Sequence, residues 1–293
     1  MSKVSAILTA DWHFRDDQPV CRLDNFMETQ IRKLQWICGI WKKYDCPLIC
    51  AGDVFDYWKS SPFLISQLLT LLPTDRQVFA VWGNHDLPQH SLELQQKSAL
   101  YTLVKAERVK ILPGVHWGQV PDVNSGMEID GKKVLVWHVG VFDSPPAWTG
   151  DADFSAIDIL NTHTEYDLIV TGHYHTPLVK KLGNRLLVNP GSISRQTADQ
   201  IESTPRVYLW YAETNSVEEL IIPHRKGVIS REHLEKKEEK LARYQAFITH
   251  LKSDKGVGLS FRQNLEQFFR INKTEKAVQE LIYWAIEKSD KEE

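Results

Sequence analysis

The sequence predicts an α/β protein built as a two-sheet sandwich flanked by helices, with a small helical appendage at the carboxyl end. Three observations predict this fold class. Apolar runs alternate with helix-like segments early in the chain, tight-turn signals separate apolar runs in the middle, and strand-like runs almost disappear after residue 223. The first pattern is typical of βαβ units, and the second is typical of antiparallel hairpins.

Five short apolar runs have the length and composition of buried strands. They cover residues 4–10, 47–51, 78–82, 134–137 and 168–171. Between the first two runs the apolar residues recur at a helical spacing: Leu23, Phe26, Ile31, Leu34, Ile37 and Trp41. We therefore expect a helix there, and further alternation of strands and helices up to about residue 84.

Hairpins are expected in the second half of the chain. Asp-Gly at 130–131 and Gly-Asn at 183–184 stand between apolar runs and predict tight turns. The runs 206–212 and 217–222 flank the polar segment 213–216 and predict another antiparallel pair. These segments would supply the antiparallel part of the sandwich.

The chain changes character near residue 223, and we predict two domains, 1–223 and 224–293. Beyond the boundary, apolar residues follow the spacing of one helical stripe, at Leu234, Leu241, Tyr244, Ile248 and Leu251, and of a final helix, at Ala277, Leu281, Trp284 and Ile286. Residues 225–276 hold thirteen Lys or Arg and seven Asp or Glu, a net charge of +6 in a chain whose total is −3. Such a region suits contact with nucleic acid or a partner protein, and a solvated helical cap fits the same pattern.

Composition limits the broad class of protein. The chain has 293 residues, 42% hydrophobic and 25% charged, which is enough for an α/β domain of roughly 200 residues and a smaller appendage. Its first residues run directly into the first apolar run, and no apolar stretch approaches the ~18 residues of a membrane helix. We expect a cytoplasmic protein with no membrane contact. The four cysteines lack a CxxC pair, which favours reduced, buried thiols.

Polar side chains directly follow almost every one of the strand-like runs. The potential metal donors among them are Asp11, His13, Asp53, Asn84, His138, His173 and His175. Open α/β sheets carry their chemistry at the carboxyl ends of their strands. Carboxylates mixed with imidazoles suit Mn, Fe or Zn better than Ca or Mg, and two neighbouring ions need a bridging carboxylate. The ordered set predicts a binuclear metal site with Asp53 as the bridge.

Two segments carry a pair of donors separated by one residue. Asp11 and His13 would project from the same side of an extended stretch, so they can hold one ion together. His173 and His175 have the same spacing, but Gly172 permits a tight turn that can send one imidazole to each ion. The intervening Trp12 points the other way and is expected to pack under the sheet.

These segments read D-x-H, GD, GNHD, H and GHxH, and together they resemble the calcineurin-like metallophosphoesterase superfamily. The resemblance spans residues 11–175, about half of the chain, with every ligand position of the pattern filled. It implies two divalent ions, expected to be manganese, with zinc, iron or cobalt as alternatives. It implies a first ion held by Asp11, His13, Asp53 and His175, and a second held by Asp53, Asn84, His138 and His173.

The resemblance also implies that His85 is the general acid or transition-state stabiliser and that Asp86 orients its ring. An imidazole beside a metal ligand, but not needed as one, can donate a proton near neutral pH. A water bridging two divalent ions has a pKa of roughly 7 instead of about 15.7. We therefore expect attack of a metal-bridging hydroxide on a phosphoester, without a covalent enzyme intermediate.

Within the superfamily, the Gly-Asp-Val-Phe-Asp segment at 52–56 and the helical carboxyl-terminal region resemble the Mre11/SbcD-type nuclease branch, in particular its compact, phage-like members. This likeness implies DNA as substrate, a role in DNA repair, and an SbcC/Rad50-like ATPase partner. The Asn-Pro-Gly-Ser segment at 189–192 is more familiar from small phosphodiesterases. Tyr57-Trp58 is similar to a feature of lipid-precursor pyrophosphatases.

Three functions remain open. The first is a metal-dependent DNA exonuclease or endonuclease working with an ATPase; the second is a phosphatase or phosphodiesterase acting on a small nucleotide or lipid precursor. The third, a scaffold that binds without cutting, is disfavoured because His85 and every metal donor are present. Tyr174 is a candidate to stack on a base and Arg195 to contact a phosphate. A homodimer is a further option.

Overall fold

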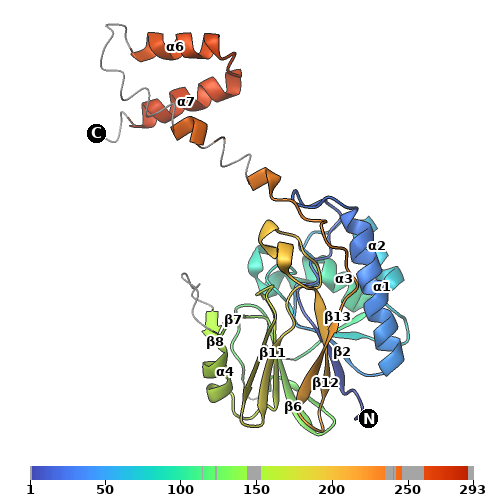
Figure 1. The fold of residues 1–293 in the computed structure, drawn as a ribbon. Coiled ribbons are helices and arrows are strands. Elements are labelled where there is room, and N and C mark those ends of the chain that lie inside the picture. Colours follow the sequence, from blue (N-terminus) through green and yellow to red (C-terminus); the bar gives the residue numbers. More distant parts are fainter. Residues whose placement is uncertain are drawn as a thin grey trace. The chain divides into compact units, whose positions relative to one another are not determined.

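The structure, a computed structural model, describes residues 2–113, 115–122, 124–143, 153–234, 240, 242–245 and 261–289. Its contacts divide the chain into two compact units, Met1–His233 and Leu234–Glu293. Within the first unit two sheets are flanked by helices (Figure 1), which confirms the expected fold class.

The first unit extends ten residues beyond the boundary expected at 223, to His233. Its last segment pairs with the loop before the first helix, because the backbone N–H of Leu23 donates to the carbonyl of Val228 and that of Ser230 donates to Cys21. The segment 224–233 therefore packs with the sandwich.

The first sheet has six strands in the order β13-β12-β1-β2-β3-β4. The four strands that run parallel are β1 (Ala6–Thr9), β2 (Leu48–Cys50), β3 (Val78–Ala80) and β4 (Val109–Ile111), and the antiparallel pair is β12 (Arg206–Tyr211) and β13 (Ser216–Ile221). Strands β1, β2 and β3 match the apolar runs of the first half, whereas β4 was not among the predicted runs. Strands β12 and β13 form the hairpin predicted around 213–216.

The second sheet has five strands in the order β10-β11-β9-β6-β5. Their bounds are β5 (Met127–Ile129), β6 (Lys132–Trp137), β9 (Leu168–Thr171), β10 (Leu178–Leu182) and β11 (Arg185–Asn189), while β7 (Gly140–Phe142) and β8 (Asp153–Ser155) form a separate parallel pair. The hairpins predicted at 130–131 and 183–184 join β5 to β6 and β10 to β11.

Aliphatic side chains fill the space between the two sheets. Successive residues of a strand point to opposite faces, so Leu8 and Ile49 of the first sheet meet Val136 and Val170 of the second in one buried cluster. The strands are apolar on their outer faces as well, so other elements must bury those faces.

Helices supply these covers. The outer face of the six-stranded sheet packs on α1 (Phe26–Tyr44), α2 (Pro62–Leu71) and α3 (Ala99–Lys105), and the outer face of the five-stranded sheet packs on α4 (Ala156–Thr162) (Figure 1). Helix α1 begins where the side chain of Asn25 accepts from the N–H of Glu28, a usual N-cap arrangement. Leu23, which we expected in this helix, therefore precedes it and is 67% exposed.

The second unit contains the helices α6 (Phe261–Ile271) and α7 (Lys276–Ser289). Helix α7 confirms the final helix that the sequence predicted, and Leu265 and Phe269 of α6 are buried. Most of the apolar stripe expected over 234–251 lies outside the described residues. Among the residues that the structure describes, no helix combines the length and apolar character needed to cross a membrane.

Candidate metal centre

Four candidate donors share an unusual backbone conformation. Directly after their strands, Asp11 (φ 47°), His13 (φ 43°), Asp53 (φ 52°) and His173 (φ 78°) adopt left-handed backbone angles. Residues other than glycine avoid this region, at a cost of about 1–3 kcal/mol each, and such strain concentrates at functional sites. The sharp bends turn side chains from several strand ends toward one point.

The first donor cluster consists of Asp11, His13 and His175, whose ligand atoms all lie within 4.8 Å of one another. A further group of potential ligands, His13, Asp56 and His85, shares His13 with it. Nε2 of His13 and Nε2 of His175 are 3.0 Å apart. Nδ1 of His175 lies 3.2 Å from the side-chain amide nitrogen of Gln200. This set matches three of the four ligands that the resemblance implied for the first ion.

The second donor cluster consists of Asp53, His138 and His173, again within 4.8 Å. Asn84 joins it, because its Oδ1 lies 3.0 Å from Nε2 of His138 and 3.1 Å from Nδ1 of His173. These four residues are the set implied for the second ion.

Asp53 lies between the two clusters. Its Oδ2 is 3.3 Å from Nε2 of His138 in the second cluster and 3.6 Å from Nε2 of His13 in the first. Its Oδ1 accepts the backbone N–H of His85 at 2.9 Å. One carboxylate oxygen thus faces donors of both clusters, as a bridging ligand must.

The residues fit divalent ions on chemical grounds. Oδ2 of Asp11 is buried and has no hydrogen-bond partner within the described part of the chain, although its Oδ1 accepts the N–H of His173. Nδ1 of His138 lies 2.7 Å from the carbonyl oxygen of Ala51, which can only accept. A proton on Nδ1 leaves Nε2 with a free electron pair, the usual preparation of a metal-binding histidine.

Burial and mutual repulsion set the charges of the site. Burial, with a contribution from Asp53, raises the pKa of Asp11 to about 7. Burial also disfavours the charged forms of Asp53 and His138, but their mutual attraction outweighs it, so the pKa of Asp53 is lowered and that of His138 is raised to about 9. Protons therefore balance the crowded carboxylates, and divalent ions can replace them because metal binding displaces protons from its ligands.

Glycine permits the close approach of the loops. A Cβ on Gly83 would lie 2.0 Å from Oδ1 of Asp53, and one on Gly52 (φ 95°) would lie 2.4 Å from Nδ1 of His138. Any larger residue would push these donors apart. The glycines of the GD and GNHD segments are thus required by packing around the donors.

His85 is exposed, whereas the donors around it are mostly buried. Its Nδ1 lies 2.7 Å from the carbonyl oxygen of Asp56, and its ring meets that of His13 edge to face at 4.7 Å. Because a carbonyl only accepts, Nδ1 carries a proton and Nε2 remains for exchange with a ligand. An exposed, oriented imidazole beside the first cluster suits the acid role expected of His85.

Asp86 does not orient this ring as we expected. Its carboxylate is fully buried and accepts the backbone N–H groups of Gly83, Val54 and Phe55 at 3.1–3.3 Å. Although Asp86 follows His85 directly in the sequence, its side chain points the opposite way, into the loops. Asp86 therefore joins the GD and GNHD segments, and the backbone of Asp56 orients His85.

The two candidate substrate contacts differ in position. Arg195 is 5% exposed, and its guanidinium donates to the backbone carbonyls of Ile201 and Arg225. Those bonds hold the loops after β11 together, so the expected contact of Arg195 with a phosphate is not supported. The ring of Tyr174 is half-buried and stacks beside His173, with centroids 5.9 Å apart, which keeps it at the site.

Sequence reasoning missed three residues at the site. Oδ1 of Asp56 lies 3.1 Å from Nδ1 of His13, and its Oδ2 lies 2.9 Å from Arg15. Gln200 contacts His175, and Trp117 covers His173 with ring centroids 4.7 Å apart. Asp56 could have been found, because it is a carboxylate only three positions after the predicted bridging ligand Asp53. Gln200 and Trp117 belong to no motif in the sequence.

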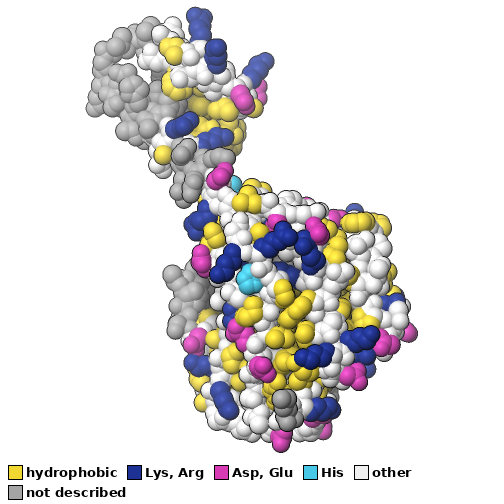
Figure 2. All heavy atoms as spheres, turned by 45° about the vertical axis from the view of Figure 1, so that its right-hand side comes forward, with side chains coloured by type: hydrophobic (Ala, Val, Ile, Leu, Met, Phe, Trp, Pro, Cys, Tyr) yellow, Lys and Arg dark blue, Asp and Glu magenta, His cyan; other side chains and the backbone are white. Residues whose placement is uncertain are grey.

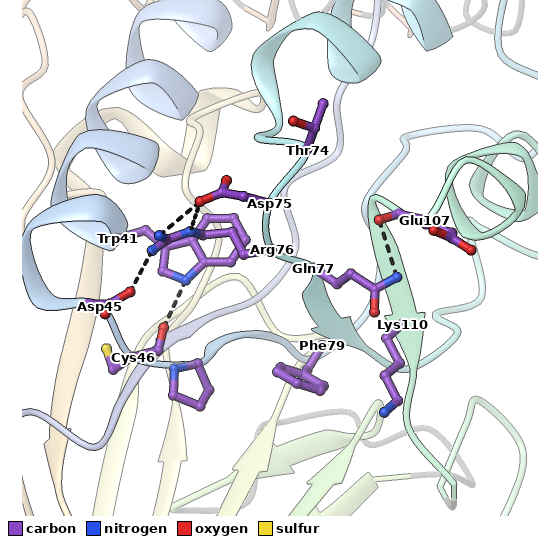
Figure 3. Close-up of a pocket in the computed structure, with 11 residues that line it drawn as sticks. Trp41, Asp45, Cys46, Thr74, Asp75, Arg76, Gln77, Phe79, Glu107 and Lys110 are labelled. Atoms are coloured by element: carbon purple, nitrogen blue, oxygen red, sulfur yellow. Dashed lines mark hydrogen bonds and ion pairs between the residues drawn. The ribbon is translucent and has the colours of Figure 1, made fainter.

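A separate hollow of about 670 Å³ lies at the opposite, amino-terminal ends of β2 and β3 (Figure 3). Its central guanidinium, that of Arg76, is 3.1 Å from both Asp45 and Asp75 and lies over the ring of Trp41. Both carboxylates are therefore paired with the same guanidinium. None of the potential metal-binding groups within the described residues includes a residue that lines this hollow.

Comparison with known families matches residues 30–209 to the calcineurin-like phosphoesterase superfamily domain. The match covers more than half of the chain, so the protein belongs to this superfamily. With the two donor clusters, membership defines it as a metal-dependent phosphoesterase. A comparison with curated proteins finds no match.

Solved structures show distant likenesses. An archaeal phosphodiesterase is 16% identical over 74% of this chain and 98% of its own, with a TM-score of 0.45. A Thermus thermophilus protein is 13% identical over 74% and 98%, with a TM-score of 0.45. A Streptococcus pneumoniae protein described as a predicted phosphoesterase is 16% identical over 75% and 99%, with a TM-score of 0.34. The assignment rests on the family match.

Proposed function

We propose that the protein is a DNA nuclease of the Mre11/SbcD type, which hydrolyses phosphodiester bonds with two divalent ions. The observation that supports this most is the exposed imidazole of His85 beside the first of two buried donor clusters that share Asp53. A phosphodiester that reaches the ions meets this imidazole at the same time. The reaction class follows from these parts alone.

The residues divide the work of hydrolysis. When bound, the ions supply an acidified water and neutralise charge on the phosphoryl oxygens. Asp11, His13, Asp53 and His175 would hold the first, and Asp53, Asn84, His138 and His173 the second. His85 gives the proton on Nε2 to the leaving oxygen, because Nδ1 is committed to the carbonyl of Asp56. Manganese is our proposal for the metal.

The second unit supports contact with a large, acidic substrate or with a partner. Its described surface shows hydrophobic side chains next to Lys and Arg (Figure 2). The stretch 225–276, which begins in the first unit and ends within the second, carries a net charge of +6, whereas residues 234–293 as a whole hold twelve Lys or Arg and eleven Asp or Glu. Lysine and arginine dominate non-specific binding to phosphates. We propose that the basic stretch 225–276 contacts DNA.

A partner surface is the second role that we propose for this unit. Ile271, Leu281 and Trp284 are 61–70% exposed, and exposed apolar groups of this size favour contact with another protein. An SbcC/Rad50-like ATPase is the proposed partner, a homodimer is an alternative, and the cytoplasm is the proposed location.

The first experiment is a substrate panel in manganese, with Asp53→Ala as the blank. It compares labelled single-stranded DNA, blunt and recessed duplexes, bis-p-nitrophenyl phosphate and p-nitrophenyl phosphate. Degradation of DNA that is absent from the blank is the expected result. Turnover of the small esters alone would replace the nuclease by a phosphoesterase for a small nucleotide or lipid precursor.

Salt provides an independent check. If several phosphates contact Lys and Arg, the affinity for DNA should fall steeply between about 50 and 200 mM salt. Binding is measured by fluorescence anisotropy with Asp53→Ala, which prevents cleavage. An affinity that is nearly constant over this range contradicts the DNA assignment.

A further inference from the structure

A row of aromatic rings borders the second donor cluster. The indole of Trp117 lies over the imidazole of His173 with centroids 4.7 Å apart and a tilt of 36°, and the ring of Tyr174 stacks on the same imidazole at 5.9 Å and 24°. His138 and His90 meet the indole edge to face at 6.0 and 6.5 Å. The site therefore has an aromatic wall beside the second donor cluster.

The backbone holds Trp117 firmly in this position. The N–H of Trp117 donates to the carbonyl of Trp82, and Nδ1 of His116 accepts the N–H of Trp82, so the segment continues the pattern of a strand beside the end of β3. The carbonyl of Gln119 accepts the indole N–H of Trp137 in β6. Trp117 thus stands on a rigid support that joins both sheets.

The indole of Trp117 has a ring face and an N–H group that can contact a ligand. The buried residues Trp12, Trp41 and Trp210 each donate their indole N–H to a partner in the protein. The indole N–H of Trp117 makes no such bond with any residue that the structure describes, and its side chain is half-buried. An accessible indole is a favourable surface for a nucleobase, because every base has a face that can stack.

The two sides of the site differ in chemistry. His85, the proposed acid, contacts His13 and Asp56 on the side of the first cluster, whereas Trp117 contacts the second cluster. Because the acid must lie next to the leaving oxygen, the leaving group occupies the first side. The substituent that stays on the phosphorus occupies the side of Trp117.

We propose that Trp117 stacks on the nucleobase of the nucleotide that retains the phosphate, so that the enzyme selects nucleotide esters among phosphodiesters. The orientation rests on the proposed hydrolysis, in which His85 serves as the acid. Recognition of the base depends only on the aromatic wall around Trp117 and does not require hydrolysis. Stacking of this kind does not read the base sequence, so little preference among the four bases is expected.

Binding tests the base site without any turnover. Titration calorimetry in manganese compares thymidine 5′-monophosphate with methyl phosphate, which has the same phosphate but no base. The wild type should bind the nucleotide about 10-fold more tightly, a difference of about 1.4 kcal/mol. Trp117→Leu should remove that preference and leave the Kd of methyl phosphate unchanged, and Trp117→Phe should restore part of it.

Two results would overturn the base site. One is equal binding of both ligands by the wild type. The other is loss of methyl phosphate binding or of manganese in Trp117→Leu, which would show that the indole only holds His173 and His138 in place. Trp284→Leu, which removes an exposed indole from the second unit, is the matched control and should retain the preference.

Kinetics then tests the orientation. Thymidine 5′-p-nitrophenyl phosphate and methyl p-nitrophenyl phosphate have the same leaving group and differ only in the retained substituent. Trp117→Leu should lower kcat/KM about 10-fold for the thymidine ester alone. Equal effects on both esters would contradict the orientation. If neither ester is hydrolysed while the nucleotide preference in binding persists, the proposed hydrolysis fails and the base site stands.

Discussion

Charged side chains are arranged differently at the two ends of β2 and β3. At the amino ends, Arg76 lies between Asp45 and Asp75 at 3.1 Å from each, so both of these carboxylates of the hollow there are paired with a guanidinium. At the carboxyl ends, Asp11, Asp53 and several imidazoles are buried together, and Oδ2 of Asp11 has no partner among the described residues.

The contrast shows that the unfavourable free energy of this fold is concentrated at the carboxyl ends of the strands. Left-handed backbone at four donors and buried carboxylates cost free energy that a folded chain avoids unless something else compensates. Bound ions provide that compensation, because anything that binds the native state alone stabilises it. Residues at the carboxyl ends should therefore affect function strongly, and their counterparts at the amino ends should not.

The largest effect is expected from Asp53→Ala. Because Oδ2 of Asp53 faces donors of both clusters, its removal should prevent the pairing of ions and reduce turnover by more than the roughly 10–100-fold that is usual for an outer partner of a metal site. Metal analysis of the purified protein should find fewer than two manganese ions per chain. Full occupancy in the variant would contradict the bridging role.

His85→Ala should leave both ions bound and lower turnover by roughly 100-fold or more, in the range usual for a lost proton donor. The loss should be greater for a DNA linkage, whose alkoxide needs a proton, than for a p-nitrophenyl ester, whose phenolate leaves unaided. Parallel kinetics on both substrates measures this. Equal losses on both would contradict proton donation by His85.

Asp56→Asn should have a smaller effect, roughly 10–100-fold on metal affinity or activity. Its carboxylate lies against Nδ1 of His13 and is paired with Arg15, so its charge supports a donor of the first ion. Manganese titration of activity is the measurement. Asp75→Asn makes the same change at the other end of the strands and should leave the titration curve unchanged.

The smallest effect on activity is expected from Lys33 of α1, which is 2% exposed and donates to the carbonyl of Ile193. Burial, together with Arg22 and Arg195, lowers the pKa of Lys33 to about 7 from the ordinary 10.5. Between these two values the unfolded chain holds a proton that the folded chain lacks, so this group's contribution to stability rises with pH and is least favourable below pH 7.

Thermal melts of the wild type and Lys33→Met at pH 7 and pH 10 test this. The Tm of the wild type should rise relative to that of the variant by roughly 7–14 °C over this interval, because the linkage is worth about 3.5 kcal/mol and each kcal/mol shifts the Tm of a domain of this size by roughly 2–4 °C. A difference in Tm that is independent of pH would show that Lys33 is charged in the folded protein.

Much of this architecture could be predicted from local sequence. The five apolar runs became strands, and the three hairpins formed where turn residues predicted them, because alternation and turn chemistry act within a few residues. The grouping of the donors could be predicted as well, since parallel strands bring their carboxyl ends to one edge.

Contacts between distant loops could not be predicted. Asp86 turned away from His85 because three backbone N–H groups of neighbouring loops needed an acceptor, and Arg195 was taken by two carbonyls. Trp117 reached the site from a loop that no motif marks. In each case the partner lies far away in sequence or on the main chain, where residue type carries no signal.

The carboxylates of Asp11 and Asp53 divide their two oxygens between different tasks. In each, Oδ1 accepts a backbone N–H from another motif loop, that of His173 or of His85, and the other oxygen faces the centre. Asparagine retains the first oxygen and replaces the second with an amide nitrogen, and a single nucleotide change converts Asp to Asn. A single change of Asp11 or Asp53 to Asn should therefore keep the contact between the motif loops and weaken metal binding.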